Sequence, residues 1–141
     1  VVRLFGFDPK VAFVSHSTFG QPLTSRTKHI RNAVEILKKK EVDFEFDGDM
    51  QPDVALNPEY EELYPFAKIV GKANILIMPG QHSAAISYKL MKTIGDTKVI
   101  GPLLIGLGLP IEIAPLRSST SEILNLASIA AYSADVIDYK K

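Results

Sequence analysis

The sequence contains no cysteine, which excludes disulfides and thiolate chemistry and is compatible with a cytoplasmic location. Its net charge is zero, with 16 Lys and Arg against 16 Asp and Glu, and this argues against nucleic acid as a partner. No apolar run approaches the roughly 18 residues that cross a membrane, so we expect no membrane partner either. Neither a GxGxxG loop nor a Walker-type lysine loop is present, which excludes nucleotide sites of those kinds.

What the sequence does contain is enough apolar residues for a folded core. Of its 141 residues, 46% are hydrophobic, which predicts one globular domain over residues 1–141. Residues 1–5 resemble neither a signal peptide nor a helix start. We therefore expect this domain to be a fragment of a longer chain.

The most informative stretch is residues 75–78, Ile-Leu-Ile-Met, because it is apolar without alternation and is closed by Pro79-Gly80. This pattern predicts a strand buried on both faces at the centre of a parallel sheet. Further strands are expected at 10–15, 44–46, 98–104 and 110–114, and helices at 27–40, 57–65, 83–94 and 120–133. The alternation of strands and helices predicts a three-layer α/β/α domain with a mostly parallel sheet.

Local signals mark the helix starts. Thr24 or Ser25 can cap the first helix, and Ser119 with Glu122 fits a capping box before the last one. Three acids at 47, 49 and 53 follow the short strand 44–46 and are expected in a loop. Their spacing lacks the glutamate of a calcium loop, so we assign no metal site and favour a loop that positions a ligand or caps a helix.

Two loops are candidates for a binding site, because loops at the carboxyl ends of parallel strands carry the chemistry of open α/β sheets. The first is rich in hydroxyls, with Ser15, Ser17 and Thr18, and either binds an anion or is a polar capping turn. His16 in this loop could act as a general base, but no acid or nucleophile partner is evident, which favours a solvated histidine. The second loop spans residues 79–83.

Five collinear segments carry a family resemblance. They are residues 7–12 (Phe-Asp-Pro-Lys-Val-Ala), 15–18 (Ser-His-Ser-Thr), 47–51 (Asp-Gly-Asp-Met-Gln), 73–79 (Ala-Asn-Ile-Leu-Ile-Met-Pro) and 100–103 (Ile-Gly-Pro-Leu). From Phe5 to Ala131 the sequence resembles the C-terminal half of the phosphate acetyltransferase/butyryltransferase family. The resemblance implies the second domain of an isocitrate/isopropylmalate dehydrogenase-like fold. It also implies a site in the cleft between two domains and acetyl transfer between coenzyme A and phosphate.

Departures from the family pattern bear on activity. Active members have Ser-Arg after the strand that follows the Gly-Pro segment, where the Arg holds phosphate, and an Asp six residues later is the candidate base for the thiol of coenzyme A. Pro115-Leu116 and Glu122 occupy these places here, and Arg117 comes one residue late. Residues 80–85 read Gly-Gln-His-Ser-Ala-Ala where the family has Asp-Leu-Asn-Ala-Gly-Asn. We therefore assign no catalytic residue.

The loss of polar groups at both places resembles the pattern in the phosphotransacetylase-like domain at the C-terminus of bacterial NADP-dependent malic enzymes. That resemblance implies a non-catalytic regulatory and oligomerisation domain that senses acetyl-CoA, forms a homodimer or larger assembly and adjoins a malic catalytic domain. It implies no cofactor in this domain, and NADP and a divalent metal in the parent. The alternatives are a fragment of an active phosphate acetyltransferase and a small α/β ligand-binding module unrelated to acyl-CoA. The expected acetyl-CoA or phosphate contacts are Ser15, Ser17, Thr18, His82, Ser83, Arg117 and Ser118.

Overall fold

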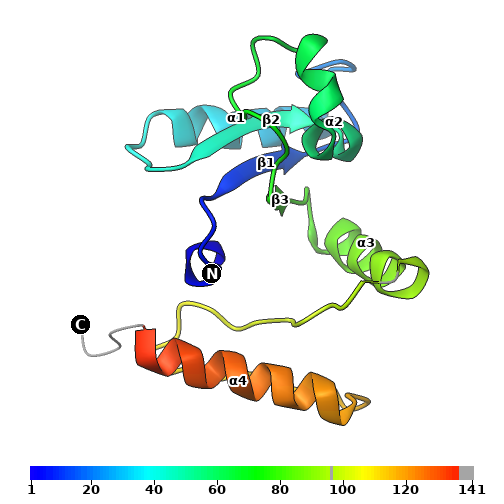
Figure 1. The fold of residues 1–141 in the computed structure, drawn as a ribbon. Helices are drawn as coiled ribbons and strands as arrows, with labels where there is room; N and C mark the ends of the chain where they lie inside the picture. Colours follow the sequence, from blue (N-terminus) through cyan, green and yellow to red (C-terminus); the bar gives the residue numbers. More distant parts are fainter. Residues whose placement is uncertain (96, 137–141) are drawn as a thin grey trace. The chain divides into compact units, whose positions relative to one another are not determined.

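The structure is a computed structural model that describes residues 1–95 and 97–136 (Figure 1). Its contacts divide the chain into two compact units. The sheet unit is Phe7–Lys89, and the α4 unit comprises Val1–Gly6 and the residues from Leu90 onward. Helix α3 (Gln81–Ile94) spans the boundary between them.

The sheet unit is built on three parallel strands, β1 (Lys10–Val14), β2 (Glu45–Met50) and β3 (Ile75–Ile77), in the order β2-β1-β3 (Figure 1). In the register of this sheet, Val11 lies opposite Phe46 on one side and Ile75 on the other. All pairings between these strands are parallel, as the sequence predicts.

The central strand is β1 rather than the apolar run at 75–78. Val11 and Ala12 are 8% and 0% exposed, and because neighbouring residues of a strand point to opposite faces, β1 is covered on both faces. β3 lies at the edge of the described sheet, and its Ile77 is 41% exposed. The prediction of a central strand buried on both faces is therefore wrong for 75–78. A continuous apolar run shows that a strand forms but does not fix its place in the sheet.

The strands expected at 98–104 and 110–114 do not form within the part of the chain that the structure describes. Pro102 lies inside the first range and removes an N–H that a strand ladder requires. Gly101 has a φ of 133°, so the backbone bends where the first strand would run straight, and Gly106, with a φ of 79°, lies in the segment between the two ranges. The strand expected at 44–46 is longer than predicted and extends to Met50.

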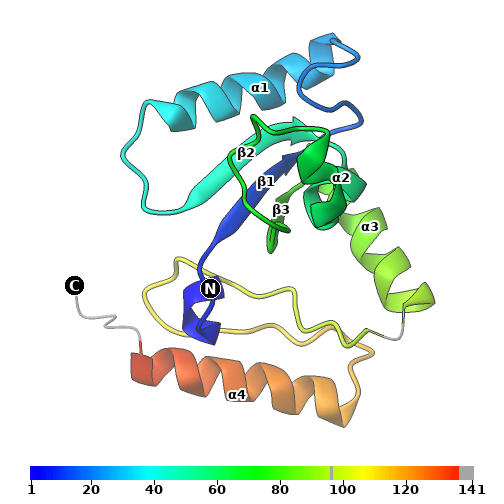
Figure 2. The same ribbon diagram turned by 45° about the horizontal axis from the view of Figure 1, so that its top comes forward.

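Helix α1 (Ser25–Lys38) packs on one face of the sheet, with Val34 only 1% exposed (Figure 2). Its start confirms Thr24 as the cap. The Thr27 backbone N–H donates to Thr24 Oγ1 at 3.2 Å, and the Thr24 N–H donates to Thr27 Oγ1 at 2.9 Å. These two bonds satisfy two backbone groups that the first helical turn leaves without partners.

Short helices follow β2. α2 (Pro52–Leu56) was not predicted, and the 3-10 helix η2 (Pro58–Glu62) replaces the longer helix expected at 57–65. The expected Asn57 cap is present, because its side chain accepts a hydrogen bond from the Glu59 N–H. α2 contributes Ala55 to the core of the sheet unit, which consists of Ala12, Met50, Ala55, Ile69 and Ala73.

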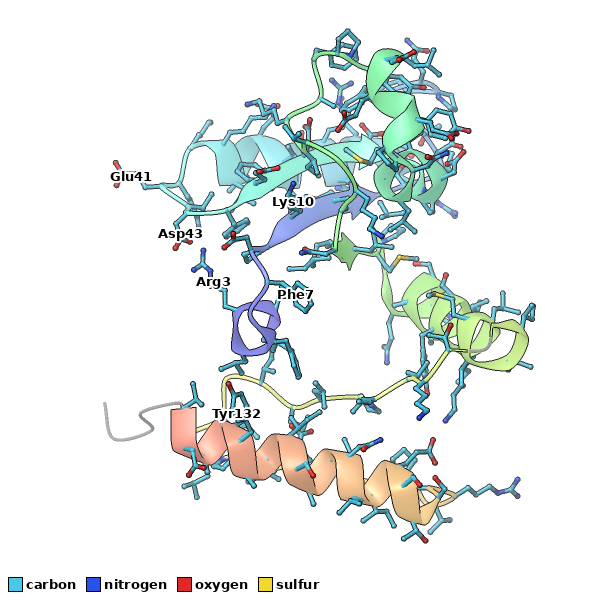
Figure 3. All side chains as sticks on the ribbon, in the orientation of Figure 1. Arg3, Phe7, Lys10, Glu41, Asp43 and Tyr132 are labelled. Atoms are coloured by element: carbon cyan, nitrogen blue, oxygen red, sulfur yellow. The ribbon has the colours of Figure 1, made fainter. Side chains whose placement is uncertain are left out.

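The α4 unit contains the 3-10 helix η1 (Val2–Phe5) and the helix α4 (Thr120–Val136). Tyr132 projects from α4 (Figure 3) and lines an apolar cavity of about 410 Å³ together with η1 and the segment 103–109. Leu126 is buried, whereas Ile123 remains 50% exposed. No helix among the described residues is both long and apolar enough to cross a membrane.

Candidate functional site

A cavity of about 420 Å³ lies in the sheet unit, where the loops after β1 and β3 lead into α1 and α3. This is the edge of a parallel sheet at which the sequence predicts a site. Residues from both predicted loops contribute to its walls. Its lining consists of Ser15, His16, Arg26, Thr27, His29, Ile30, Pro79, Gly80, Gln81, His82 and Ser83.

The charged and titratable side chains that line this cavity are all basic. Its lining includes all three histidines of the sequence, His16, His29 and His82, together with Arg26. Among the described residues that line it, none is an aspartate or glutamate. Arg26 and His29 are three residues apart in the first turns of α1, which places them on the same side of the helix. The arrangement suits an anion.

Ser15, Ser17 and Thr18 of the hydroxyl loop after β1 are all buried, and of the three only Ser15 lines the cavity. Ser15 lines the cavity, and its Oγ accepts a hydrogen bond from the Ser17 N–H at 3.0 Å. Ser17 is 0% exposed, and its Oγ lies 3.2 Å from Ser15 Oγ. Thr18 is also buried, and its Oγ1 accepts from the Gln51 N–H at 3.2 Å. Ser17 and Thr18 do not line the cavity, and their hydrogen bonds hold the loop in position.

A buried carboxylate holds this loop. Asp49 is 0% exposed, and Ser17 Oγ donates a hydrogen bond to its Oδ2. Its other oxygen, Oδ1, lies 3.8 Å from Arg31 Nε and has no hydrogen-bond partner among the described residues. A buried carboxylate without its donor is costly, so Asp49 and Ser17 depend on each other.

The prediction that Asp47 and Asp49 lie in a loop is wrong, because both belong to β2. Asp47 Oδ2 accepts a hydrogen bond from the Lys68 N–H at 2.7 Å, and this contact ties the segment after η2 to the sheet. The two acids thus have separate structural partners. Within residues 1–95 and 97–136, no group of three or more His, Cys, Asp or Glu side chains is placed to hold a metal ion.

Arg117 and Ser118, the remaining predicted contacts, belong to the α4 unit. Arg117 is exposed, and the Ser118 N–H donates to the Pro115 carbonyl at 3.0 Å in the turn before α4. Ser118 Oγ is buried and has no hydrogen-bond partner among the described residues. Leu116 is fully exposed.

Glu122 has a structural role at the start of α4. The Lys92 ammonium donates to Glu122 Oε1 at 2.6 Å, and the N–H and hydroxyl of Ser119 donate to Oε2 at 2.7 and 3.0 Å. The Lys92 hydrogen bond first, and then those of Ser119, lower the pKa of Glu122 to about 2. The Glu122 N–H donates in turn to Ser119 Oγ at 3.2 Å, which confirms the predicted capping box.

Three of the predicted site residues line this cavity, and two of its basic residues were not predicted. Ser15, His82 and Ser83 were expected at the site and do line one cavity. Arg26 and His29 were missed, because the predicted helix began at residue 27, whereas α1 begins at Ser25 and thereby places both residues on one side of the helix. The sequence did not indicate that Asp49 is buried, because its hydrogen-bond partner Ser17 lies 32 residues earlier in the chain.

Comparisons with known proteins identify the family of the chain. The sequence profile described as phosphate acetyl/butaryl transferase matches residues 1–131. The chain is 47% identical to an NADP-dependent malic enzyme of Rhizobium meliloti over 134 residues, which cover 95% of this chain and 18% of that protein. It is 32% identical to a phosphate acetyltransferase of Bacillus subtilis, covering 94% of this chain and 41% of that enzyme. The chain thus spans only about a fifth of the malic enzyme's length.

A solved structure gives the same result for the fold. A phosphotransacetylase from Streptococcus pyogenes superposes with a TM-score of 0.86 at 34% identity, over 95% of this chain and 41% of that one. This likeness confirms the predicted α/β class and the predicted similarity to phosphotransacetylases. The chain resembles the phosphotransacetylase-like segment of NADP-dependent malic enzymes and of phosphate acetyltransferases alike. It belongs to the phosphate acetyl/butaryl transferase family.

Proposed function

We propose that residues 1–141 form a non-catalytic regulatory and oligomerisation domain of a cytoplasmic NADP-dependent malic enzyme. The catalytic part of that parent would oxidatively decarboxylate malate to pyruvate with NADP and a divalent metal. Acetyl-CoA is the effector that we propose for this domain. The 47% identity to the Rhizobium meliloti malic enzyme, over nearly the whole of this chain, supports this choice.

The proposal rests on the residues found at three positions, Pro115, Leu116 and Glu122. Acetyl phosphate carries a dianion that requires a bidentate cation, and Leu116 offers only an exposed apolar side chain where the family has arginine. Arg117 is the neighbouring cation, but it is offset by one residue. The phosphate-holding group of an acetyltransferase is therefore missing from its usual place.

Glu122, at the position of the family's candidate base, is also poorly suited to that role. A general base works best when its pKa lies near the working pH. Lys92 and Ser119 engage both carboxylate oxygens of Glu122 and hold its pKa at about 2, so its carboxylate has little tendency to accept a proton from a thiol. The absence of this cation and the low pKa of Glu122 both argue against acetyltransferase activity.

An acetyl phosphate assay tests the proposal. Formation of acetyl phosphate from acetyl-CoA and phosphate should stay at background for the full polypeptide that contains residues 1–141, with the Bacillus subtilis enzyme as positive control. Leu116→Arg should strengthen phosphate binding, whereas Ile113→Arg, which adds the same charge at another exposed apolar position, should not. Steady turnover by the unaltered protein would support the working-acetyltransferase alternative instead.

The oligomerisation part of the proposal rests on the apolar surface of α4. Ile123 and Leu124 are 50% and 64% exposed on this helix, and exposed apolar side chains of this kind are typical of an interface. We expect light scattering to report a dimer or larger assembly at micromolar concentration. A monomer at that concentration would contradict this part of the proposal and leave the assay above unaffected.

A further inference from the structure

We propose that the apolar cavity of the α4 unit binds a small amphipathic cation, an aliphatic chain of about eight carbons that ends in a primary ammonium group. Glu112 is the lining residue that receives the ammonium group. This cavity shares no lining residue with the histidine-lined cavity of the sheet unit. Its occupation depends on neither a malic parent nor acetyl-CoA.

The walls of this cavity come from three segments of one unit. Leu4 belongs to η1, Leu107 to the segment 103–109 and Ile129 to α4, and all three segments lie in the α4 unit. Most of the lining residues have aliphatic side chains, and Leu107 and Leu109 remain 44% and 66% exposed. A hollow with a contiguous apolar lining of this kind is typical of a binding site for a small molecule.

The volume of the cavity sets the size of the ligand. It measures about 410 Å³, near the lower end of the range of roughly 300–1,000 Å³ that is common for small-molecule sites. A dry apolar cavity of ~150 Å³ already accepts a benzene ring, so this one has room for a longer chain. We therefore expect an aliphatic chain to fill it, with each further buried methylene group tightening binding about fourfold.

Glu112 brings the only charge among the side chains that the structure describes in this lining. The Leu104 N–H donates to Glu112 Oε2 at 3.1 Å, which holds the carboxylate at the wall. The other oxygen, Oε1, accepts no hydrogen bond from the described residues. Tyr132 (Figure 3) and Ser133 add two hydroxyl groups from α4. The lining therefore offers hydrogen-bond acceptors and one negative charge within an apolar surface.

A primary ammonium group matches this set of acceptors. It carries one positive charge and several N–H donors, which Glu112, Tyr132 and Ser133 can accept. A hydrogen bond between an ammonium and a carboxylate is charge-assisted, and it is stronger than the bond that a neutral hydroxyl would make to the same carboxylate. A ligand that ends in a carboxylate would be repelled by Glu112. The cavity should therefore select its ligand by the charge of the head group.

Three probes with the same aliphatic chain and different heads test this selection, namely n-octylamine, 1-octanol and octanoate. Their affinity for the full polypeptide would be measured by calorimetry and by methyl NMR shifts, below the concentrations at which they form micelles. We expect n-octylamine to bind about tenfold more tightly than 1-octanol, and octanoate to bind more weakly than either. n-Hexylamine, which is two methylene groups shorter, should bind roughly fifteenfold more weakly than n-octylamine.

Two pairs of variants separate the cavity from the general surface. Glu112→Gln should lose the preference for the amine and keep 1-octanol binding, because the amide oxygen can still accept from the Leu104 N–H. Glu59→Gln, which removes a negative charge from the exposed surface of η2, is its matched control and should keep the preference. Ser133→Phe should fill the cavity and weaken all three probes, whereas Ser128→Phe, at an exposed α4 position outside the lining, should not.

Three results would each overturn the proposal. They are no binding of n-octylamine, binding of 1-octanol or octanoate that is as tight as that of the amine, and a preference for the amine that persists in Glu112→Gln. Uptake of many amine molecules per chain would also overturn it, because it would indicate partitioning onto apolar surface in general. If n-octylamine binds as expected and acetyl phosphate forms in the assay above, the proposed function fails and this site stands.

Discussion

Ser17→Ala should destabilise the sheet unit far more than the loss of one hydroxyl suggests. Both Ser17 and its partner Asp49 are fully buried, and Ser17 Oγ is the donor to Asp49 Oδ2. Asp49 Oδ1 already lacks a hydrogen bond among the described residues, with Arg31 Nε 3.8 Å away. The variant would therefore leave a buried carboxylate with neither oxygen satisfied. Such a group costs ~1–3 kcal/mol or more, and we expect a loss of about 2–3 kcal/mol.

Native-state hydrogen exchange measures this loss locally, whatever the behaviour of the α4 unit. A loss of about 2–3 kcal/mol should speed exchange of the protected β1 amides roughly 30- to 140-fold. Ser25→Ala, at an exposed position of α1, is the matched control and should have little effect. The double variant Ser17→Ala with Asp49→Asn should lose less than the sum of the single variants, because a neutral amide is less costly to leave unpaired. A loss below about 0.5 kcal/mol for Ser17→Ala would refute this reasoning.

Three further predictions concern the helix caps and the α4 unit. Thr24→Ala removes the acceptor of the first turn of α1 and should cost ~1 kcal/mol by denaturant titration; an unchanged midpoint would contradict the cap. The pKa of Glu122, lowered to about 2 mainly by Lys92, lies below its ordinary value of 4.5, so its carboxylate stabilises the start of α4 above that value. That support should disappear as the pH falls from 4.5 towards 2, and NMR of the first α4 turn should show no such step in Glu122→Gln. Arg117→Ala should weaken acetyl-CoA binding by roughly one to two decades by calorimetry, whereas a loss confined to Glu122→Gln would mean that Glu122 faces the ligand.

Local features of the fold were the ones that sequence could predict. The caps of α1 and α4 each depend on hydrogen bonds between residues only three positions apart, so the residues that make them are visible in a short window. The apolar stretch around β3 likewise signals a strand. Its place at the edge of the sheet depends on which segments pair with it, and no local pattern encodes that choice.

For the site, too, sequence predicted local features but not contacts between distant segments. The loops after β1 and β3 were identified because a parallel sheet gathers the carboxyl ends of its strands at one edge, and Ser15 and His82 do line one cavity there. The role of Asp49 could not be predicted, because it arises where β2 packs against the loop after β1. The acid looked like part of a polar loop in sequence and is the least exposed carboxylate of that segment in the structure.

Malate-dependent reduction of NADP by the full polypeptide, measured with and without acetyl-CoA, is the most direct test of the proposed regulatory role. If the domain regulates, acetyl-CoA should change this rate, Arg117→Ala should shift the response to higher acetyl-CoA concentrations, and no acetyl phosphate should form in the same preparation when phosphate is added. A malate-dependent rate that does not respond to acetyl-CoA, together with steady formation of acetyl phosphate, would contradict the claim that this domain regulates rather than catalyses.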